Sequence, residues 1–75
     1  MSNLKNHNWK VIFKILTKKG FVIRHQKGSH ILLGNPDGRR VTIVRKNPIK
    51  VGTLKSILKQ AEITQKDFEY ELNSL

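Results

Sequence analysis

The side chains in this sequence best suited to exchange protons near neutral pH are its three histidines, His7, His25 and His30. His30 follows Gly28-Ser29, a pair typical of a tight turn between two strands. We therefore expect His30 at the beginning of a strand, beside a turn. From these features alone, a structural role in which the imidazole bonds a backbone carbonyl is an equally good interpretation.

Cations surround His30 in the sequence. Four of them are expected near it, along the chain or across the predicted hairpin: Arg24, Lys27, Arg39 and Arg40. A phosphate held there would meet both positive charge and an imidazole, a combination suited to cleavage of a phosphodiester. For His25, in the first predicted strand, packing, exposure and a functional role all stay open. His7 is expected to be solvated and inert.

The remaining residues exclude several other kinds of site. There is no cysteine, so three scattered histidines make a zinc cluster a poor interpretation. The five carboxylates show neither glycosidase nor two-metal spacing. No glycine-rich phosphate loop is present, and no serine lies in a nucleophile elbow. We expect neither a cofactor nor a metal.

The charge of the chain points to a polyanion as its partner. Fifteen Lys and Arg against five Asp and Glu give a formal charge of +10. Residues 1–61 hold 14 of these cations and one acid, Asp37, whereas residues 62–75 hold one cation and four acids. A basic body attracts nucleic acid, while a charged solvated surface without a partner is the alternative. Whether the acidic segment folds back on the basic body stays open.

The elements that must position these residues follow from the spacing of apolar side chains. Helical spacing from Trp9 to Leu16 predicts a first helix, with Asn8 as its N-cap and Gly20 just past its end. Three β-prone stretches follow at 21–27, 30–33 and 40–44. Their short links predict an antiparallel meander.

Two more helices are expected after the strands. One covers 53–61 with Thr53 as its N-cap, and a short one covers about 64–72 with Thr64 as its N-cap. This is an α+β fold in which two helices pack on one face of a three-stranded antiparallel sheet, the layout of the double-stranded-RNA-binding fold. We expect all 75 residues to form one domain with its core at about 9–61.

Several features suggest where the chain works. No apolar run approaches the roughly 20 residues that span a membrane. The first eight residues lack the apolar core of a signal peptide. The absence of cysteine fits a reducing compartment. We expect a cytoplasmic protein without membrane contacts.

Four blocks of sequence occur in a specific order. They are Gly20-Phe21, Gln26-Lys27-Gly28-Ser29-His30, Pro36-Asp37-Gly38-Arg39-Arg40-Val41-Thr42 and Gly52-Thr53-Leu54-Lys55-Ser56-Ile57-Leu58-Lys59-Gln60-Ala61. Together they resemble the HicA toxin family of prokaryotic toxin–antitoxin modules, over roughly residues 9–72. The resemblance implies a double-stranded-RNA-binding-like fold, ribosome-independent cleavage of mRNA and neutralisation by a HicB antitoxin. It also implies that His30 is the catalytic residue.

The chain departs from the family near this motif. His25 stands where the family often has arginine, and an arginine stands one place earlier, as Arg24. Strict alternation along a strand predicts that these two side chains point to opposite faces of the sheet. Ile31 replaces a second histidine that many members have, and a basic segment, Arg45–Pro48, follows the third strand.

Together with these residues, the resemblance implies a metal-independent endoribonuclease that cleaves mRNA, with the 2′-OH of the RNA as nucleophile and His30 as general base or acid. The residues expected to contact RNA are Lys27, Gly28, Ser29, Arg39, Arg40, Lys46, Lys55 and Lys59. Lys55 and Lys59 can equally be solvated lysines opposite the apolar stripe of their helix. The sequence identifies no second proton-transfer group.

An acidic, HicB-like antitoxin is expected to cover His30, and DNA is expected to be contacted only through the antitoxin complex. Two other functions stay open. A non-catalytic RNA-binding module would use the same fold and leave His30 structural. A DNA-binding regulator would place the helix over 53–61 in a groove, although no turn-linked helix pair precedes it. Membrane action is disfavoured because the core needs the apolar faces of the helices.

Overall fold

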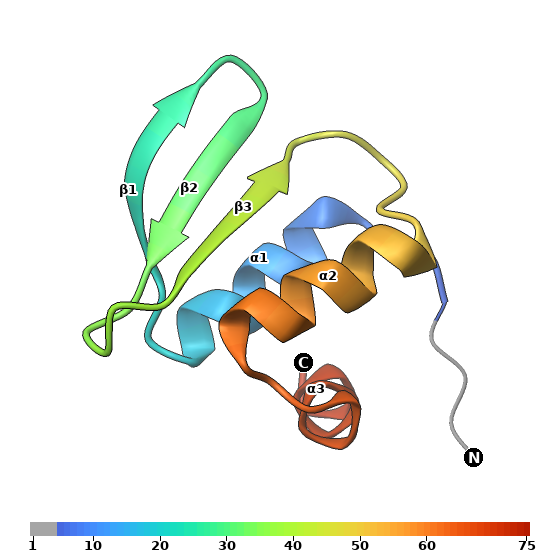
Figure 1. Cartoon of the computed structure of the whole chain (residues 1–75). Helices are drawn as coiled ribbons and strands as arrows, with labels where there is room; N and C mark the ends of the chain where they lie inside the picture. Colours follow the sequence, from blue (N-terminus) through green and yellow to red (C-terminus); the bar gives the residue numbers. More distant parts are fainter. Residues whose placement is uncertain (1–4) are drawn as a thin grey trace.

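The computed structural model describes residues 5–75, which fold into helices and strands in the order α1-β1-β2-β3-α2-α3 (Figure 1). The bounds are α1 Trp9–Lys18, β1 Val22–Lys27, β2 His30–Gly34, β3 Arg40–Val44, α2 Val51–Ala61 and α3 Gln65–Asn73. The strands lie side by side in the order β1-β2-β3, and both pairs are antiparallel. The predicted α+β class and the antiparallel meander are confirmed.

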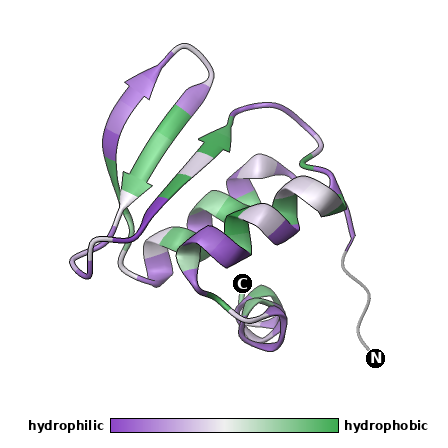
Figure 2. Ribbon diagram, in the orientation of Figure 1, coloured by the Kyte–Doolittle hydropathy of each residue, from purple (hydrophilic) through white to green (hydrophobic). Residues whose placement is uncertain are grey.

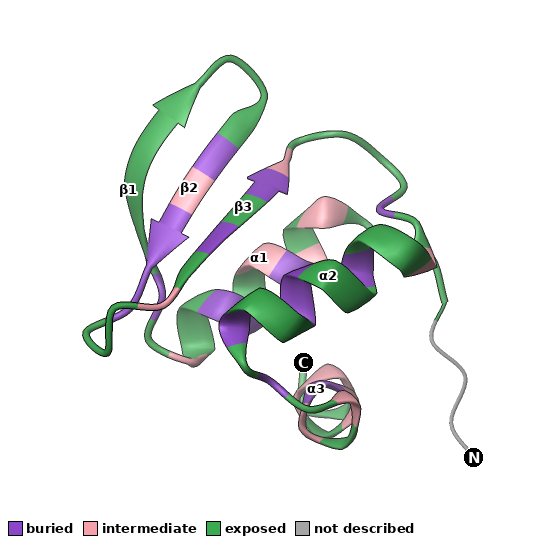
Figure 3. Ribbon diagram, viewed as in Figure 1, coloured by how far each residue is buried: buried purple, intermediate pink, exposed green. Residues whose placement is uncertain are grey.

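The helices gather on one side of the sheet, where α2 packs against β3 and α3 packs against α1 (Figure 1). Alternate residues of β2 and β3 are apolar and buried beneath the helices (Figures 2 and 3). Cross-strand pairs share a face, so Lys27, His30, Leu32 and Arg40 leave the sheet on the opposite side, which we call the outer face. No helix of the described part of the chain is long and apolar enough to span a membrane.

Strand β1 is exposed along its whole length because it lies at the edge of the sheet, beyond the helices (Figure 3). Even its apolar side chains Val22 and Ile23 are 52% and 47% exposed. Phe21, expected as the first residue of this strand, precedes it and is buried in the core. The β1–β2 hairpin therefore projects from the helical layer.

Two helices begin as the sequence predicts. The Asn8 Oδ1 atom accepts a hydrogen bond from the backbone N–H of Lys10 at 2.9 Å, which makes Asn8 the N-cap of α1. Gly20, just past the end of α1, has a φ of +91°, a conformation that favours glycine. Thr64 caps α3, and its Oγ1 accepts from the N–H of Asp67 at 3.0 Å.

Helix α2 begins at Val51, so the prediction that Thr53 is its N-cap is wrong. The cap residue is Lys50, whose side chain makes no capping hydrogen bond. Instead, the N–H of Val51 donates to Oδ1 of Asn6 at 3.1 Å. This distant acceptor satisfies a first-turn donor, so the cap lies three residues earlier than predicted.

The segment before α1 is tied to the loop between β3 and α2, residues 45–50. The N–H of Trp9 donates to Oδ1 of Asn47 at 2.9 Å. The backbones of His7 and Ile49 exchange two hydrogen bonds, at 3.1 and 2.7 Å. The ring of His7 also meets the ring of Phe68 edge-on, with 5.6 Å between centroids. The expectation that His7 is solvated is therefore wrong, because it packs between the loop and α3.

The acidic C-terminal segment folds back on α1, which answers a question that the sequence leaves open. Lys18 Nζ lies 3.1 Å from a Glu71 carboxylate oxygen, and Lys19 Nζ lies 2.7 Å from Asp67 and 3.1 Å from Glu71. Hydrogen bonds from Lys18 and Lys19 lower the pKa of Glu71. The hydrogen bond to Asp67, with a further one to Glu71, raises the pKa of Lys19. Beneath these ion pairs, Phe68 is fully buried.

Candidate functional site

The structure places His30 where the sequence predicts, at the first residue of β2 and beside a two-residue turn. His30 is exposed, and it pairs with Lys27 of β1 and with Val44 of β3. Side chains of directly paired residues project from the same face, with Cβ atoms about 5 Å apart. An accessible imidazole and a lysine are therefore neighbours on the outer face.

The turn before His30 depends on Gly28. Its φ of +57°, in a region that L side chains rarely adopt, suits the first central position of a type II′ hairpin turn. The carbonyl oxygen of Ser29, the second turn residue, accepts the N–H of Arg45 at 2.7 Å. This hydrogen bond ties the turn to the chain that leaves β3, so the position of His30 is set from two sides.

Two more cations follow β3 at the same end of the sheet as His30. Lys46, one of the residues expected to contact RNA, is exposed in the loop after β3. The guanidinium carbon of Arg45 lies 5.2 Å from the centre of the Trp9 ring, a cation–π arrangement. Arg45 was not among the predicted RNA-contacting residues. Its place directly after a strand that must pair with the start of β2 is the signal that could have indicated it.

Arg39 and Arg40 lie at the other end of the sheet, so the expectation that they are near His30 is wrong. Arg40 pairs with Gly34, whereas His30 pairs with Val44. Arg40 is therefore four residues away from His30 along the strands. At the usual rise per residue this is about 14 Å. The link between β2 and β3 returns the chain opposite Gly34, and the predicted antiparallel meander already implies this, because a third strand that starts at Arg40 begins opposite the end of the second strand.

Arg39 is also engaged by acids. It lies 3.0 Å from the Asp37 carboxylate and 2.9 Å from the carboxylate of Glu62, at the end of α2. The hydrogen bond with Glu62 is the largest influence on both groups, raising the pKa of Arg39 and lowering the pKa of Glu62. Arg39 therefore serves the contact between the β2–β3 turn and α2, and its predicted role with RNA stays a prediction.

Lys55 and Lys59 are exposed on α2, which packs on the helical side of the sheet. The structure does not bring them to the face that carries His30. Contact with RNA and simple solvation therefore both stay open for these two lysines.

A β-bulge brings Arg24 and His25 to the same face. Ile23 pairs with Leu33 and His25 pairs with Leu32, which leaves Arg24 as an extra residue without a partner in β2. The prediction that Arg24 and His25 point to opposite faces is wrong, because the bulge interrupts the alternation. His25 lies diagonally across the hairpin from His30, a relation that usually separates residues by about 7–8 Å.

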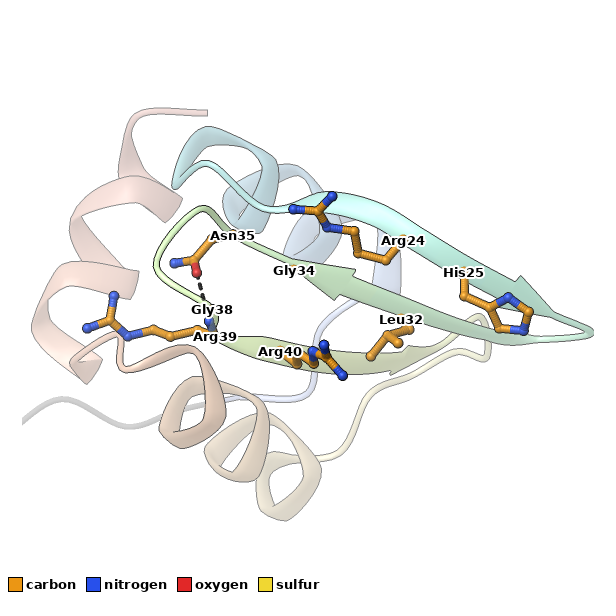
Figure 4. Close-up of a pocket in the computed structure, with 8 residues that line it drawn as sticks. All are labelled: Arg24, His25, Leu32, Gly34, Asn35, Gly38, Arg39 and Arg40. Atoms are coloured by element: carbon orange, nitrogen blue, oxygen red, sulfur yellow. Dashed lines mark hydrogen bonds between the residues drawn. The ribbon is translucent and has the colours of Figure 1, made fainter.

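Arg24 and His25 line a hollow of about 380 Å³ on the outer face (Figure 4). The other residues that line it are Leu32, Gly34, Asn35, Gly38, Arg39 and Arg40. Among residues 5–75, none of the ion pairs found involves Arg24, His25, Lys27 or Arg40. The same residues contain no group of three or more His, Cys, Asp or Glu that could hold a metal ion.

Fold and site together define a small α+β protein with a histidine on a cationic hairpin. Residues 9–63 match the family model described as the HicA toxin of bacterial toxin–antitoxin modules. The chain therefore belongs to the HicA toxin family. The match includes the turn and His30 and ends just after α2, so α3 lies outside it. A comparison with curated proteins gave no match.

Proposed function

We propose that this HicA family toxin is a metal-independent endoribonuclease that cleaves mRNA, with His30 as its general acid or base. The observation that carries the proposal is an exposed imidazole directly opposite Lys27, at the end of a hairpin turn anchored by the Ser29–Arg45 hydrogen bond. Histidine is the side chain best suited to proton transfer near neutral pH, and the lysine supplies positive charge beside it.

The proposed reaction uses the ribose of the substrate as the nucleophile. The 2′-oxygen attacks the adjacent phosphorus and loses its proton, while the bond from phosphorus to the 5′-oxygen breaks and that oxygen gains a proton. The products carry a 2′,3′-cyclic phosphate and a 5′-hydroxyl. His30 performs one of the two proton transfers, and Lys27 stabilises the charge that develops on the phosphate.

The geometry also limits which other residues can act on the phosphate that is cleaved at His30. Arg39 and Arg40 are about 14 Å along the strands from His30, too far to contact the same phosphate. His25, diagonal to His30 on the outer face, is the nearest second imidazole that can carry a proton. It is our candidate for the other proton transfer.

We also propose that a HicB-like antitoxin silences the toxin by covering His30 with an acidic surface. The support comes from the acids of this chain, which are engaged elsewhere. Glu62 pairs with Arg39, and Asp67 and Glu71 pair with the end of α1. The hairpin face keeps its positive charge and is complementary to an acidic partner.

The test compares the wild-type chain with two matched variants, His30→Gln and His25→Gln, on a labelled mRNA in EDTA. Both variants lose an imidazole from the same face. We expect wild-type cleavage with a 2′,3′-cyclic phosphate product, and a loss of about 10²–10⁴-fold for His30→Gln. RNA with 2′-deoxyribose at the cut position should resist. Thermal melting and RNA binding are measured for each variant, so that loss of fold is recognised.

Four other outcomes would each contradict a different part of the proposed function. Wild-type rates for His30→Gln would remove His30 from the reaction, and a larger loss for His25→Gln would transfer the main role to His25. Dependence on a divalent metal would contradict metal-independent cleavage. RNA binding without cleavage by any of the three proteins would favour the non-catalytic RNA-binding module.

A further inference from the structure

We propose that the hollow around Gly34 is a second phosphate subsite, in which Arg24 and Arg40 hold a backbone phosphate of the RNA other than the one cleaved at His30. The inference rests on the proposed function, because it assigns that hollow to the same RNA strand. A phosphate bound in this hollow would be far from the reacting atoms, and it would fix the direction in which the RNA strand crosses the sheet.

The backbone of the hairpin shapes this hollow. Without the bulge, the pairing of His25 with Leu32 would continue to set Arg24 opposite Leu33, which faces the helices. The extra residue releases Arg24 from that face and lets Ile23 pair with Leu33 instead. The bulge therefore takes a cation from the core side and presents it on the outer face, where Figure 4 shows it beside Gly34.

Gly34 makes room for that arginine. A Cβ atom at this position would lie 3.1 Å from Cγ and 3.2 Å from Nε of Arg24, closer than ordinary van der Waals contact. Arg40 is the direct partner of Gly34 in β3, so the two guanidinium groups come from the strands on either side of a floor without a side chain (Figure 4). Oxygen atoms of a phosphate can approach between them.

The rim of the hollow is fixed before any ligand arrives. Oδ1 of Asn35, which is buried, accepts the backbone N–H of Arg39 at 2.9 Å, as Figure 4 shows. Half-buried Leu32 adds an apolar contact surface. The backbone at the rim is therefore ordered before binding, so binding orders mainly the side chains of Arg24 and Arg40.

The charges also favour an anion. Arg39 is held by Asp37 and Glu62, whereas none of the ion pairs found among residues 5–75 involves Arg24 or Arg40. Both of these arginines are exposed. Guanidinium groups bind phosphate in a bidentate manner, which makes two of them around one hollow a suitable anion site.

The position relative to His30 identifies the phosphate as a different one. His30, Leu32 and Gly34 alternate along β2 on the outer face. Gly34 and its partner Arg40, at the far end of the hollow, are therefore about 14 Å from His30 along the strand. An RNA strand lying along β2 would pass Lys27 and His25 before it reaches the two arginines, so a single phosphate cannot contact both His30 and this pair.

The test measures equilibrium binding of an RNA that extends the cut site on both sides and carries 2′-deoxyribose at the cut position. The double variant Arg24→Gln/Arg40→Gln is compared with Lys10→Gln/Lys14→Gln, which removes the same charge from exposed positions on α1. Loss of this one phosphate contact should reduce the slope of log K against log salt by about 0.7. The α1 variant should keep the wild-type slope. Arg24→Lys/Arg40→Lys should recover the slope, because it restores the charge, but should bind more weakly than wild type at a given salt concentration, because it lacks bidentate geometry.

A second measurement compares cleavage of this RNA, with ribose at the cut, against cleavage of a short RNA that spans only the cut site. The ratio of kcat/KM for the longer RNA to kcat/KM for the short RNA should fall at least about tenfold in the arginine variant, because only the longer RNA reaches the hollow. This fall corresponds to about 1.4 kcal/mol. A salt slope and a length advantage equal to those of the α1 variant would overturn the subsite. Binding needs no chemistry, so a chain that cleaves neither RNA would contradict the proposed function and leave the subsite measurable. Melting curves identify any variant that fails to fold.

Discussion

At the scale of single residues, the position of the candidate catalytic imidazole depends on a glycine and a carbonyl group. Gly28 turns the chain with a φ of +57°, and the Ser29 carbonyl accepts the Arg45 N–H at 2.7 Å. Neither residue needs a reactive side chain for this role. The turn therefore acts by positioning His30, and mutations in the turn can test this role separately from the proton transfer by His30.

We predict that Gly28→Ala destabilises the chain by about 1–2 kcal/mol, because an L side chain is strained at this φ. Cleavage should fall as well, since the first residue of β2 would shift. Ser29→Ala is the matched control, and its stability should stay within about 0.5 kcal/mol of wild type because only its backbone bonds Arg45. Urea denaturation of both variants provides the measurement. Equal stability of Gly28→Ala and Ser29→Ala would contradict the assignment of strain to Gly28.

The sequence predicts part of this residue-scale picture. A two-residue turn must bring Lys27 opposite His30, so their pairing follows from local spacing. Nothing in the sequence indicates the bulge at Arg24. One extra residue in a strand moves every side chain before it to the other face of the sheet, and the composition of the strand stays the same. The distance of Arg40 from His30 does follow from the predicted meander, because an antiparallel strand that starts at Arg40 begins opposite the end of the strand that starts at His30.

At the scale of elements, α3 is an addition to the part of the chain that matches the family model. Phe68 anchors it in the core, while Asp67 and Glu71 pair with Lys18 and Lys19 of α1. Thr64 and the apolar spacing around Phe68 make this helix predictable from the sequence. Its docking site is not predictable, because α1 offers several exposed lysines and only packing selects Lys18 and Lys19.

The ion pairs of Glu71 predict a loss of stability in acid. Its pKa is lowered from the ordinary 4.5 by Lys18 and then Lys19, so folding favours the ionised form. The resulting stabilisation is present above pH 4.5 and is lost as the pH falls through the lower pKa of the folded state. We expect the free energy of unfolding to fall below this pH in the wild type and to fall less in Glu71→Gln.

Glu69→Gln is the control for this measurement, since it removes the same charge from α3. Glu69 accepts a hydrogen bond from Gln65 at 3.3 Å, and no ion pair described between α1 and α3 includes it. Chemical denaturation at a series of pH values should show Glu69→Gln following the wild type. A fall as steep in Glu71→Gln as in the wild type would show that the docking of α3 does not depend on these pairs.

The start of α2 shows why the order of elements is easier to predict than their ends. Apolar spacing identifies the helix, but its first turn is completed by Asn6, which lies 45 residues away in sequence. His7 is a similar case, because its contacts with Ile49 and Phe68 join segments that only the folded chain brings together. Such contacts have no local signature in the sequence.

At the scale of the whole molecule, positive and negative charges occupy different regions. The acids near α1 and α2 are paired with Lys18, Lys19 and Arg39, while the outer face and the loop after β3 keep their cations. An acidic antitoxin and an RNA would therefore approach the same region. On the proposed function, the antitoxin silences the toxin by competing with RNA for that surface.

We predict that association with the antitoxin slows with salt, by at least about tenfold between low and high ionic strength, because screening removes electrostatic steering. The dissociation rate should change much less. Lys27→Gln/Lys46→Gln should slow association more than Lys10→Gln/Lys14→Gln, which removes the same charge from α1. Stopped-flow mixing over a range of salt concentrations measures these rates. Equal slowing by the two pairs would show that the antitoxin does not dock on the hairpin face.

The bulge in β1 also bears on aggregation through the exposed edge of the sheet. An exposed edge strand offers unpaired backbone groups to any other strand, and β1 is such an edge. A regular strand from a second copy could not stay in register past Arg24, and Lys27 would place like charges together. The same irregularity that shapes the hollow thus opposes the addition of a further strand at this edge.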